Sequence, residues 1–536
     1  MAACFIIKTD NGENIMKKKK FILVRPPRFL WPFINESDNF LLPLGLPSIA
    51  AAVRQGVPEV EVKVIDCPPL KIGWKTLAQL LRQENPDFIG AGEEALYNHE
   101  ALKLFSLAKQ INPEVITIAG GHFFSWMVEY GLQNKVLDVI VRFEGEETTV
   151  ELIKVLSREG DLSNVKGIAY KMSGQIIKNA LRPLVENLDT LPIAAFDLMP
   201  MGKYSPLGYL WPRSVTLEHS RGCIDKCSFC SLWTFWGKHI NTDVERGQLE
   251  AMPRYRTKSV ARTLEEVDLV YKKYNRRYII WADATFNIDP NWTNEFCDGL
   301  LKRNYKDLYW WAFLRADYLL RDEKLGILDK MVRGGMIHPL IGVERGCTED
   351  LRKLHKSVYT QELIKEVFSI FKRKYPQVFR QGTFVTCLPF DTRESMLGLV
   401  DFAKEIDMDY PAFHPVAPVP GTMIYNEAKA GNLLEEEDFR RYDWATPLMR
   451  SYTGLSRKDF ADLNMELNKR YVLCRPLWLV RGLFCRYKHK RGLYWWFFRN
   501  TLKVMFLSMI DTLSGEKKLE YMTGFKQLRK PKWYDS

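Results

Sequence analysis

The segment HSRGCIDKCSFCSLWTFW, residues 219–236, gathers Cys223, Cys227 and Cys230 into eight consecutive positions, whereas the whole chain of 536 residues has ten cysteines. Cysteines at such short spacing are typical of a metal site, because thiolates are strong ligands for zinc and iron. A closed zinc site usually takes four ligands, but the next cysteine here is Cys297. The spacing C-x3-C-x2-C is compatible with an iron–sulfur cluster that keeps one iron open, and with a zinc site that a flanking histidine completes.

The cysteine segment directly follows the first strand of a predicted β/α series. Its candidate strands are apolar runs separated by helical patterns such as TLEEVDLVYKKY, and six β/α units are typical of a partial barrel. In such barrels the active end lies at the carboxyl ends of the strands, which is where the cysteines fall. The six runs are residues 214–220, 278–286, 308–318, 337–344, 382–389 and 410–418.

An earlier β/α alternation occupies residues 21–155. Its short apolar runs read as buried parallel strands, and the intervening stretches have helical spacing, which predicts a doubly wound Rossmann-type sheet. Ligands of such sheets sit beyond the carboxyl ends of the strands. The runs are residues 21–27, 60–66, 87–92, 115–121 and 138–146, and the glycines at or near their ends are Gly90, Gly92, Gly120, Gly121 and Gly145.

These patterns divide the chain into five parts. We expect an extension over residues 1–20, the Rossmann domain over 21–160, and a connector with a hairpin over 161–212. The partial (β/α)6 barrel follows over 213–430, and a basic helical region over 431–536. The fold class is therefore α/β with a helical C-terminal region.

Composition narrows the class of protein. With 46% apolar and 26% charged residues, widespread disorder is excluded. The N-terminus has no apolar segment followed by a cleavage site, and the scattered cysteines are not a disulfide framework, so a reducing cytoplasm is expected. The net charge of +12 is compatible with plain solubility or with an anionic partner such as lipid headgroups. No nucleic-acid partner is expected.

The tail concentrates this positive charge. Residues 471–510 contain eight Lys or Arg and no Asp or Glu, and they include the aromatic run LYWWFF at 493–498. No run reaches the roughly 18 apolar residues that a spanning helix needs. The pattern favours peripheral contact with an anionic membrane, and the alternative is a helix packed on the barrel with a basic outer face.

The cysteine motif, with Phe229 before its last cysteine, resembles the signature of the radical S-adenosylmethionine (SAM) family. The resemblance implies that the three cysteines are the catalytic metal ligands of a 4Fe–4S cluster whose open iron binds SAM. It also implies reductive cleavage of SAM to a radical that attacks an unactivated carbon, and a flavodoxin- or ferredoxin-type electron donor.

Further residues resemble the cofactor-facing segments of this family. Asp283 lies in WADATFNID, which looks like the second-strand segment near the methionine portion of SAM, and Arg315 lies in an RAD resembling the third-strand arginine. Glu344 lies in IGVERG, similar to a fourth-strand segment. Pro420 and Gly421 lie in PVPGT, similar to the sixth-strand segment near adenine. Alternatively, Asp283 and Glu344 are buried ion-pair partners of arginines.

A doubly wound domain before a radical SAM barrel resembles the cobalamin-binding class of the family, most of all the anaerobic magnesium-protoporphyrin IX monomethyl ester cyclase group. The resemblance implies cobalamin at the glycine-bearing strand ends and at Asp66, His122 and Glu144. One departure stands out: many cobalamin domains carry D-x-H-x-x-G with a histidine ligand to cobalt, but here Asp66 is followed by Pro68 and Lys71. That loop therefore supplies no imidazole.

The sequence thus predicts a cobalamin-dependent radical SAM enzyme that oxidises, cyclises or methylates a carbon of a hydrophobic, tetrapyrrole- or lipid-like substrate. The alternatives are a radical SAM lipid methyltransferase and a member without cobalamin. A more remote alternative is a zinc-bearing, membrane-associated binding protein, with His219 or His239 as an additional ligand.

Overall fold

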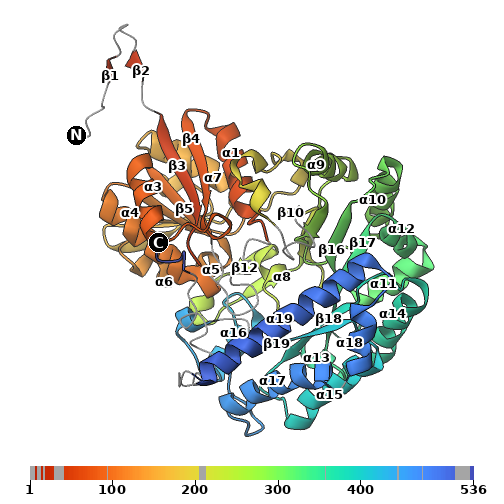
Figure 1. Ribbon diagram of the computed structural model, residues 1–536. Coiled ribbons are helices and arrows are strands. Elements are labelled where there is room, and N and C mark those ends of the chain that lie inside the picture. Colours follow the sequence, from red (N-terminus) through yellow and green to blue (C-terminus); the bar gives the residue numbers. More distant parts are fainter. Residues whose placement is uncertain are drawn as a thin grey trace.

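The structure is a computed structural model that describes residues 7–8, 14–15, 18–28, 41–92, 95–204, 213–356, 358–442, 446–473, 475–513 and 532–536. Two separate α/β units lie side by side, and a group of C-terminal helices covers the second of them (Figure 1). Of the expected extension over residues 1–20, the described ranges contain only residues 7–8, 14–15 and 18–20, and the last two of these already belong to the first strand of the sheet.

The first unit is built on a seven-stranded sheet in the order β4-β3-β5-β6-β7-β8-β9. Its first five strands are parallel, and they comprise β3 (Lys19–Arg25), β4 (Val60–Asp66), β5 (Phe88–Gly92), β6 (Ile116–Gly120) and β7 (Val139–Val141). This is the strand order of a doubly wound fold, as the alternation of apolar runs and helical patterns predicts. The hairpin β8 (Ile168–Met172) and β9 (Gln175–Lys178), expected in the connector, extends this sheet as antiparallel strands.

Helices cover both faces of the first sheet because its strands are apolar on both sides. Helices α1 (Gly45–Gly56) and α7 (Glu146–Ser157) pack on one face, where Phe21 and Leu23 lie. Helices α3 (Trp74–Glu84) and α4 (Asn98–Ile111) pack on the other, with Ile22 and Val24. Because neighbouring side chains along β3 point to opposite faces of the sheet, they pack into two separate hydrophobic cores.

The second unit is a sheet of six parallel strands in sequential order, β10-β15-β16-β17-β18-β19. All six expected runs form these strands, which are β10 (Ser214–Leu217), β15 (Tyr278–Trp281), β16 (Tyr309–Leu314), β17 (Met336–Glu344), β18 (Gln381–Thr386) and β19 (Tyr410–Pro415). The connecting helices include α9 (Val260–Lys272), α10 (Pro290–Arg303), α11 (Ala316–Lys324), α12 (Ile327–Arg333), α14 (Gln361–Lys374) and α15 (Arg393–Glu405). Sequential parallel order with these crossovers is the topology of a partial barrel.

Four short strands after β10 were not anticipated from the sequence. Strands β11 (Ser220–Cys223) and β14 (Arg254–Thr257) pair antiparallel, and so do β12 (Lys238–Asn241) and β13 (Glu250–Met252). Each has at most four residues, which is too short for a periodic hydrophobic pattern to reveal. They surround the cysteine segment and tie it to the chain that follows it.

The barrel sheet has a helix-covered outer face and an inner face. Trp281, Trp310 and Leu314 point outward into the main hydrophobic core. Because side chains alternate along a strand, the inner face carries Trp311 and Phe313 on β16. Near the amino ends of the strands the inner face is filled by the packed side chains of Tyr278, Ile280, Tyr309, Trp311 and Ile337.

The tail forms α17 (Arg457–Leu473), α18 (Pro476–Leu483) and α19 (Lys488–Leu513), and α19 lies across the barrel in front of β18 and β19 (Figure 1). His489 packs on Tyr309 with ring centroids 4.0 Å apart, and Phe497 stacks on Tyr410 at 3.9 Å. The buried Lys490 of α19 forms an ion pair with Asp409 at 2.7 Å. Phe497 therefore packs α19 on the barrel, as the alternative of a packed helix predicts for this part of the tail.

Residues 532–536 return to the first unit, close to α3 and α4 (Figure 1). The backbone N–H groups of Lys75 and Thr76, in the first turn of α3, both donate to the carbonyl of Ser536 at 3.0 Å, and that of Trp74 donates to Tyr534. These carbonyls pair helix N–H groups that have no partner inside the helix. The segment thereby holds the amino end of α3, which follows the Asp66 loop in the chain.

Candidate functional site

The three cysteines lie on one loop at the carboxyl end of the barrel. Cys223 ends β11, and Cys227 and Cys230 follow in a turn in which the Cys230 N–H donates to the Cys227 carbonyl at 3.2 Å. The indole N–H of Trp233, on α8 (Leu232–Phe235), donates to the same carbonyl at 3.0 Å. Cys223 and Cys230 pack in one hydrophobic cluster with Trp233 and Ala251, and Cys227 lies between them on the same loop. The structure thus brings together the cysteines that the spacing singled out.

The electrostatic surroundings of the thiols are mixed. Burial raises the pKa of Cys223 to about 11 and that of Cys227 to about 12, although Arg315 opposes the rise at Cys223 and Lys356 opposes it at Cys227. Burial also raises the pKa of Cys230. Without a metal the thiols therefore stay protonated, and a bound metal has to displace their protons.

Among the described residues, no three His, Cys, Asp or Glu side chains converge on one point as the ligands of a single ion do. A 4Fe–4S cluster takes one thiolate per iron at separate corners, and three thiols on one loop with two neighbouring cations match that donor set. The residues present therefore fit the cluster, with Cys223, Cys227 and Cys230 as its holders.

Arg315 and Glu344, both expected near SAM, border the cysteine loop. Arg315 pairs with Asp225, which lies between the first two cysteines, and with Asp317 at 2.7 Å. Glu344 accepts from Lys356 at 2.7 Å and has φ 62, a conformation uncommon for a residue other than glycine. The arginine partners considered for Glu344 are thus wrong, since a lysine takes that place. Asp225 and Lys356 belong to no recognisable motif, so sequence reasoning missed both.

Asp283 lies deeper than expected. It is fully buried, and its Oδ1 accepts from the backbone N–H of Ser220 at 2.6 Å and lies 2.8 Å from Nδ1 of His219. It also accepts from the Ser220 hydroxyl at 2.6 Å. Asp283 thus contacts Ser220 and His219, and not the arginines that were considered as its partners. This position makes Asp283 an anchor for the chain that leads into the cysteine loop.

The PVPGT segment joins the barrel to the first unit. The Thr234 hydroxyl donates to the Gly421 carbonyl at 2.6 Å. Gly421 has φ 91, and a Cβ there would lie 2.2 Å from Nε1 of Trp126. Only glycine allows this close approach. Pro420 is buried beside it, and Phe229 packs into the core that both units share.

The glycines of the first unit divide into two groups. Gly92 is exposed, and Gly120 and Gly121 are half-buried beside it at the carboxyl edge of β5 and β6. A Cβ at Gly120 would meet only the Val141 carbonyl, at 3.5 Å. This edge is a backbone surface without side chains, on which a flat cofactor fits. Gly90 and Gly145 instead pack internally, since a Cβ there would clash with Leu23 and Ile49 respectively.

The loop after β4 lacks the histidine that many cobalamin domains carry there, and the structure shows what its Asp66 contacts instead. Asp66 is fully buried, pairs with Arg25 at 2.6 Å and accepts from the hydroxyl of Tyr204. Pro68 is the second residue of the one-turn helix α2 (Cys67–Leu70), and no imidazole stands in the loop. His122 lies elsewhere, stacked on Phe235 of the barrel unit at 3.8 Å, and burial lowers its pKa to about 4. Asp66 is thus held by the protein itself.

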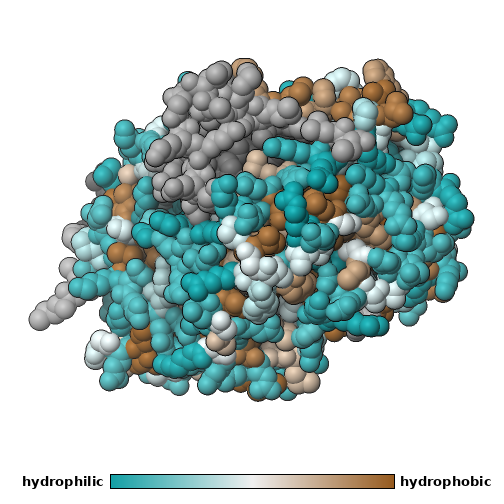
Figure 2. All heavy atoms as spheres, turned by 90° about the horizontal axis from the view of Figure 1, so that it is seen from below, coloured by the Kyte–Doolittle hydropathy of each residue, from teal (hydrophilic) through white to brown (hydrophobic). Residues whose placement is uncertain are grey.

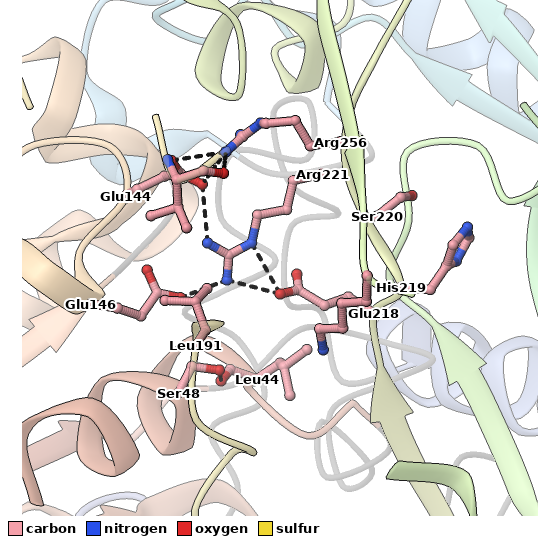
Figure 3. A network of polar contacts seen from close by, with 12 residues as sticks. Leu44, Ser48, Glu144, Glu146, Leu191, Glu218, His219, Ser220, Arg221 and Arg256 are labelled. Carbon is pink, nitrogen blue, oxygen red and sulfur yellow. Dashed lines mark hydrogen bonds and ion pairs between the residues drawn. The ribbon is translucent and has the colours of Figure 1, made fainter. Parts of the chain in front are cut away.

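Glu144, the last of the expected cobalamin-domain residues, points into the boundary between the two units (Figure 3). It accepts from Arg221 at 3.1 Å and from Arg256 at 2.9 Å, and it accepts the Val185 N–H at 2.8 Å. The site residues of the first unit therefore follow its carboxyl edge from the glycines to a buried ionic contact with the barrel.

Comparisons with known proteins agree with this geometry. The B12 binding domain matches residues 31–153, and the radical SAM superfamily matches residues 217–403. The chain is similar to an uncharacterized methyltransferase of Pyrococcus horikoshii, with 29% identity over 88% of this chain and 95% of that one. It is also similar to the anaerobic magnesium-protoporphyrin IX monomethyl ester cyclase of Rubrivivax gelatinosus, with 26% identity over 72% of this chain and 66% of the cyclase.

Among solved structures, the fold is similar to that of the radical SAM methyltransferase TsrM from Kitasatospora setae, solved with cobalamin and a 4Fe–4S cluster bound. The TM-score is 0.60 at 15% identity, over 83% of this chain and 82% of that one. The two domain matches coincide with the two sheets and imply a 4Fe–4S cluster, SAM and cobalamin as cofactors. The chain is therefore an enzyme of the cobalamin-binding class of the radical SAM family.

Proposed function

We propose that this enzyme functionalises an unactivated carbon of a hydrophobic, lipid- or tetrapyrrole-like molecule, by methylation or by oxidation and cyclisation. When bound, the cluster and SAM supply a carbon-centred radical, and cobalamin supplies a methyl group or an electron. The likeness to a methyltransferase over most of both chains supports methylation. A flavodoxin- or ferredoxin-type protein would deliver the electrons.

The inner face of the barrel carries this proposal. Near the amino ends of the strands it is closed by packed side chains and by α19, as described above. Towards the carboxyl ends Phe313 is 39% exposed, and Ala282 and His414, on the same face, are exposed as well. An apolar, solvent-accessible surface at the active end of the barrel suits an apolar substrate, because burying it on binding is favourable.

The test is a product search with the reconstituted, reduced holoenzyme, SAM and cobalamin, using extracted lipid and tetrapyrrole fractions as substrates. We expect mass spectrometry to reveal one new species heavier by a methylene, or one that has lost hydrogen if cyclisation is the reaction. The Cys223→Ala variant is the matched control and should form neither. Turnover of polar fractions alone would contradict the hydrophobic substrate.

We further propose that the α18–α19 surface docks on an anionic membrane. Leu477, Val480 and Phe484, on and just after α18, are 72%, 51% and 77% exposed and follow one another at helical spacing. Trp495 of α19 is partly exposed as well. It lies next to α18, since its indole N–H donates to the Leu483 carbonyl at 3.0 Å. No helix among the described residues is long and apolar enough to cross a membrane.

The distribution of charged residues supports the same docking surface. The tail has no acidic residue over positions 471–510, and Arg481, Arg486 and Lys488 are exposed next to the apolar side chains. Each basic residue near an anionic surface contributes about 1 kcal/mol, and the contribution falls as salt screens the charge. An enzyme that takes an apolar substrate from the bilayer would benefit from such a surface.

The prediction is tested by flotation with vesicles that contain anionic lipid. We expect the wild-type protein to float at low salt, and the double variant Leu477→Ser/Phe484→Ser to bind at least about 10-fold more weakly, since each buried side chain contributes about 1.5–3 kcal/mol. Leu325→Ser, at another exposed leucine, is the control and should float like the wild type. Equal flotation of the double variant, or none of the wild type, would contradict the docking surface.

A further inference from the structure

A buried ionic network joins the two units directly beside the cluster loop (Figure 3). The guanidinium of Arg221, on β11, contacts Glu144 at 3.1 Å, Glu146 at 2.5 Å and Glu218 at 2.8 Å. Arg256, opposite Arg221 on β14, contacts Glu144 at 2.9 Å. Glu144 and Glu146 belong to the first unit, whereas the other three belong to the second. All but Glu218 are almost completely buried.

The arrangement depends on the shape of arginine. Nε of Arg221 donates to Glu218 at 3.0 Å, Nη1 donates to Glu144, and Nη2 donates to both Glu146 and Glu218. The guanidinium carbon also lies 4.9 Å from the ring centroid of Trp236. A lysine offers one point charge and cannot direct fixed planar donors at three carboxylates.

The network forms only when the two units are docked in one way. A different docking of the two units would leave buried carboxylates and guanidiniums without partners, which is strongly unfavourable. A buried pair of this kind contributes less to net stability than to the choice of a single arrangement. The contact therefore defines how the first unit sits on the barrel.

Its location connects this arrangement to the chemistry. Arg221 stands two residues before Cys223 on the same short strand. Glu144 follows β7, at the carboxyl edge where Gly120 and Gly121 leave a surface for a flat cofactor. One guanidinium thus links the strand that carries the first cluster ligand to the cofactor edge of the other unit.

We propose that Arg221 is a positioning residue that fixes the separation between the iron–sulfur cluster and the cobalt of bound cobalamin. The inference rests on the cofactors assigned to the family and is independent of the substrate. A misplacement of about 1 Å in a reacting site reduces the rate by about 10²-fold. The alignment of the two metal centres is therefore expected to be more sensitive to Arg221 than cofactor loading is.

The experiment measures the magnetic coupling between the reduced cluster and Co(II) cobalamin by electron paramagnetic resonance of the full-length holoenzyme. In both Arg221→Met and Arg221→Lys we expect the magnetic coupling to change or to broaden. The change should be smaller in Arg221→Lys, which keeps the positive charge. The iron and cobalamin contents of both variants should equal those of the wild type, because Arg221 is not among the expected cofactor ligands. Glu146→Gln perturbs the network from the other unit without approaching the cysteines, and it should change the coupling in the same direction.

The matched control is Arg54→Met. Arg54 also joins the first unit to the following chain through a bidentate contact with Asp197 at 2.6 Å and 3.1 Å, but that pair is about half exposed. The Arg54→Met variant should leave the magnetic coupling unchanged, because exposed ion pairs contribute little. Wild-type coupling in Glu146→Gln and Arg221→Met, or an equal change in Arg54→Met, would overturn the proposal.

Discussion

Replacing Cys223, Cys227 or Cys230 with alanine is expected to remove the broad iron–sulfur absorbance and to abolish SAM cleavage. In the proposed site each thiol holds one iron. The three cysteines lie on a single loop, and among the described residues no further cysteine joins the cluster of side chains that contains Cys223 and Cys230. The remaining two thiolates cannot retain a cluster with three ligated irons. Visible absorbance, iron and sulfide content, and SAM cleavage after anaerobic reconstitution measure the effect.

The control for this prediction is Cys297→Ala. Cys297, on α10, is fully buried in the main hydrophobic core, which is a different cluster of side chains from that of Cys223 and Cys230. Its loss should cost some stability but leave iron, sulfide and SAM cleavage at the wild-type level. A full cluster in any of the three single variants would refute the assignment. Wild-type protein with one zinc and no iron would support the zinc-bearing alternative instead.

Replacing Asp409 with asparagine is expected to loosen α19 from the barrel. The carboxylate lies 2.9 Å from Nε of Arg380 and 2.7 Å from Nζ of Lys490, and it accepts from the hydroxyl of Tyr494 at 2.7 Å. Asparagine keeps the shape but leaves the buried Lys490 without its carboxylate partner and Arg380 with only the more distant Asp407, at 3.9 Å. Breaking a buried ion pair in this way costs about 3–5 kcal/mol. Hydrogen exchange of the α19 amides should report this loss as a lower local free energy of opening.

The pH dependence provides a second check. Burial raises the pKa of Asp409, but Arg380 and Lys490 outweigh burial and hold it at about 2. Because the folded pKa lies below the unfolded value of about 3.9, the stabilisation is present above about pH 4 and is lost as the pH falls towards 2. The difference between variant and wild type should shrink over that window.

The matched control is Asp401→Asn, in an exposed pair with Lys404. Surface pairs of this kind contribute at most about 1 kcal/mol, so α19 should keep its protection. Unchanged exchange of α19 in the Asp409 variant at neutral pH would contradict the role given to the ion pair. Asp409→Asn removes the charge but leaves the stacking of Phe497 on Tyr410 in place, so it measures the contribution of the ion pairs apart from that of aromatic packing.

The strands and the grouping of the three cysteines were predictable because both are local properties of the chain. Runs such as VEVKVID, residues 60–66, show their burial by composition and spacing, and the structure forms β4 over those residues. The cysteines were predictable because residue identity and spacing alone define a ligand set. The short strands around the cysteine loop escaped because their own patterns are too brief, and because β11 also pairs with β14 more than thirty residues further along the chain.

The polar site residues were located by motif, but their partners were not. Asp66 pairs with Arg25, Asp283 accepts from Ser220, and Glu344 pairs with Lys356. Nothing in a motif distinguishes a carboxylate that faces a cofactor from one that anchors a loop. That difference depends on which donors the fold brings within about 3 Å, and such donors lie anywhere in the chain.

The sequence by itself determined the order of the two α/β units, the six barrel strands and the three cysteines, since hydrophobic period and ligand spacing are written along neighbouring residues. Only the tertiary structure decided which charges are buried. Lys490 turns inward to Asp409 from a tail that reads as uniformly basic, and Arg221 reaches Glu144, 77 residues earlier, across the boundary between the units. Electrostatic pairing falls off with distance in space and not in sequence, so the fold has to form before these partners exist.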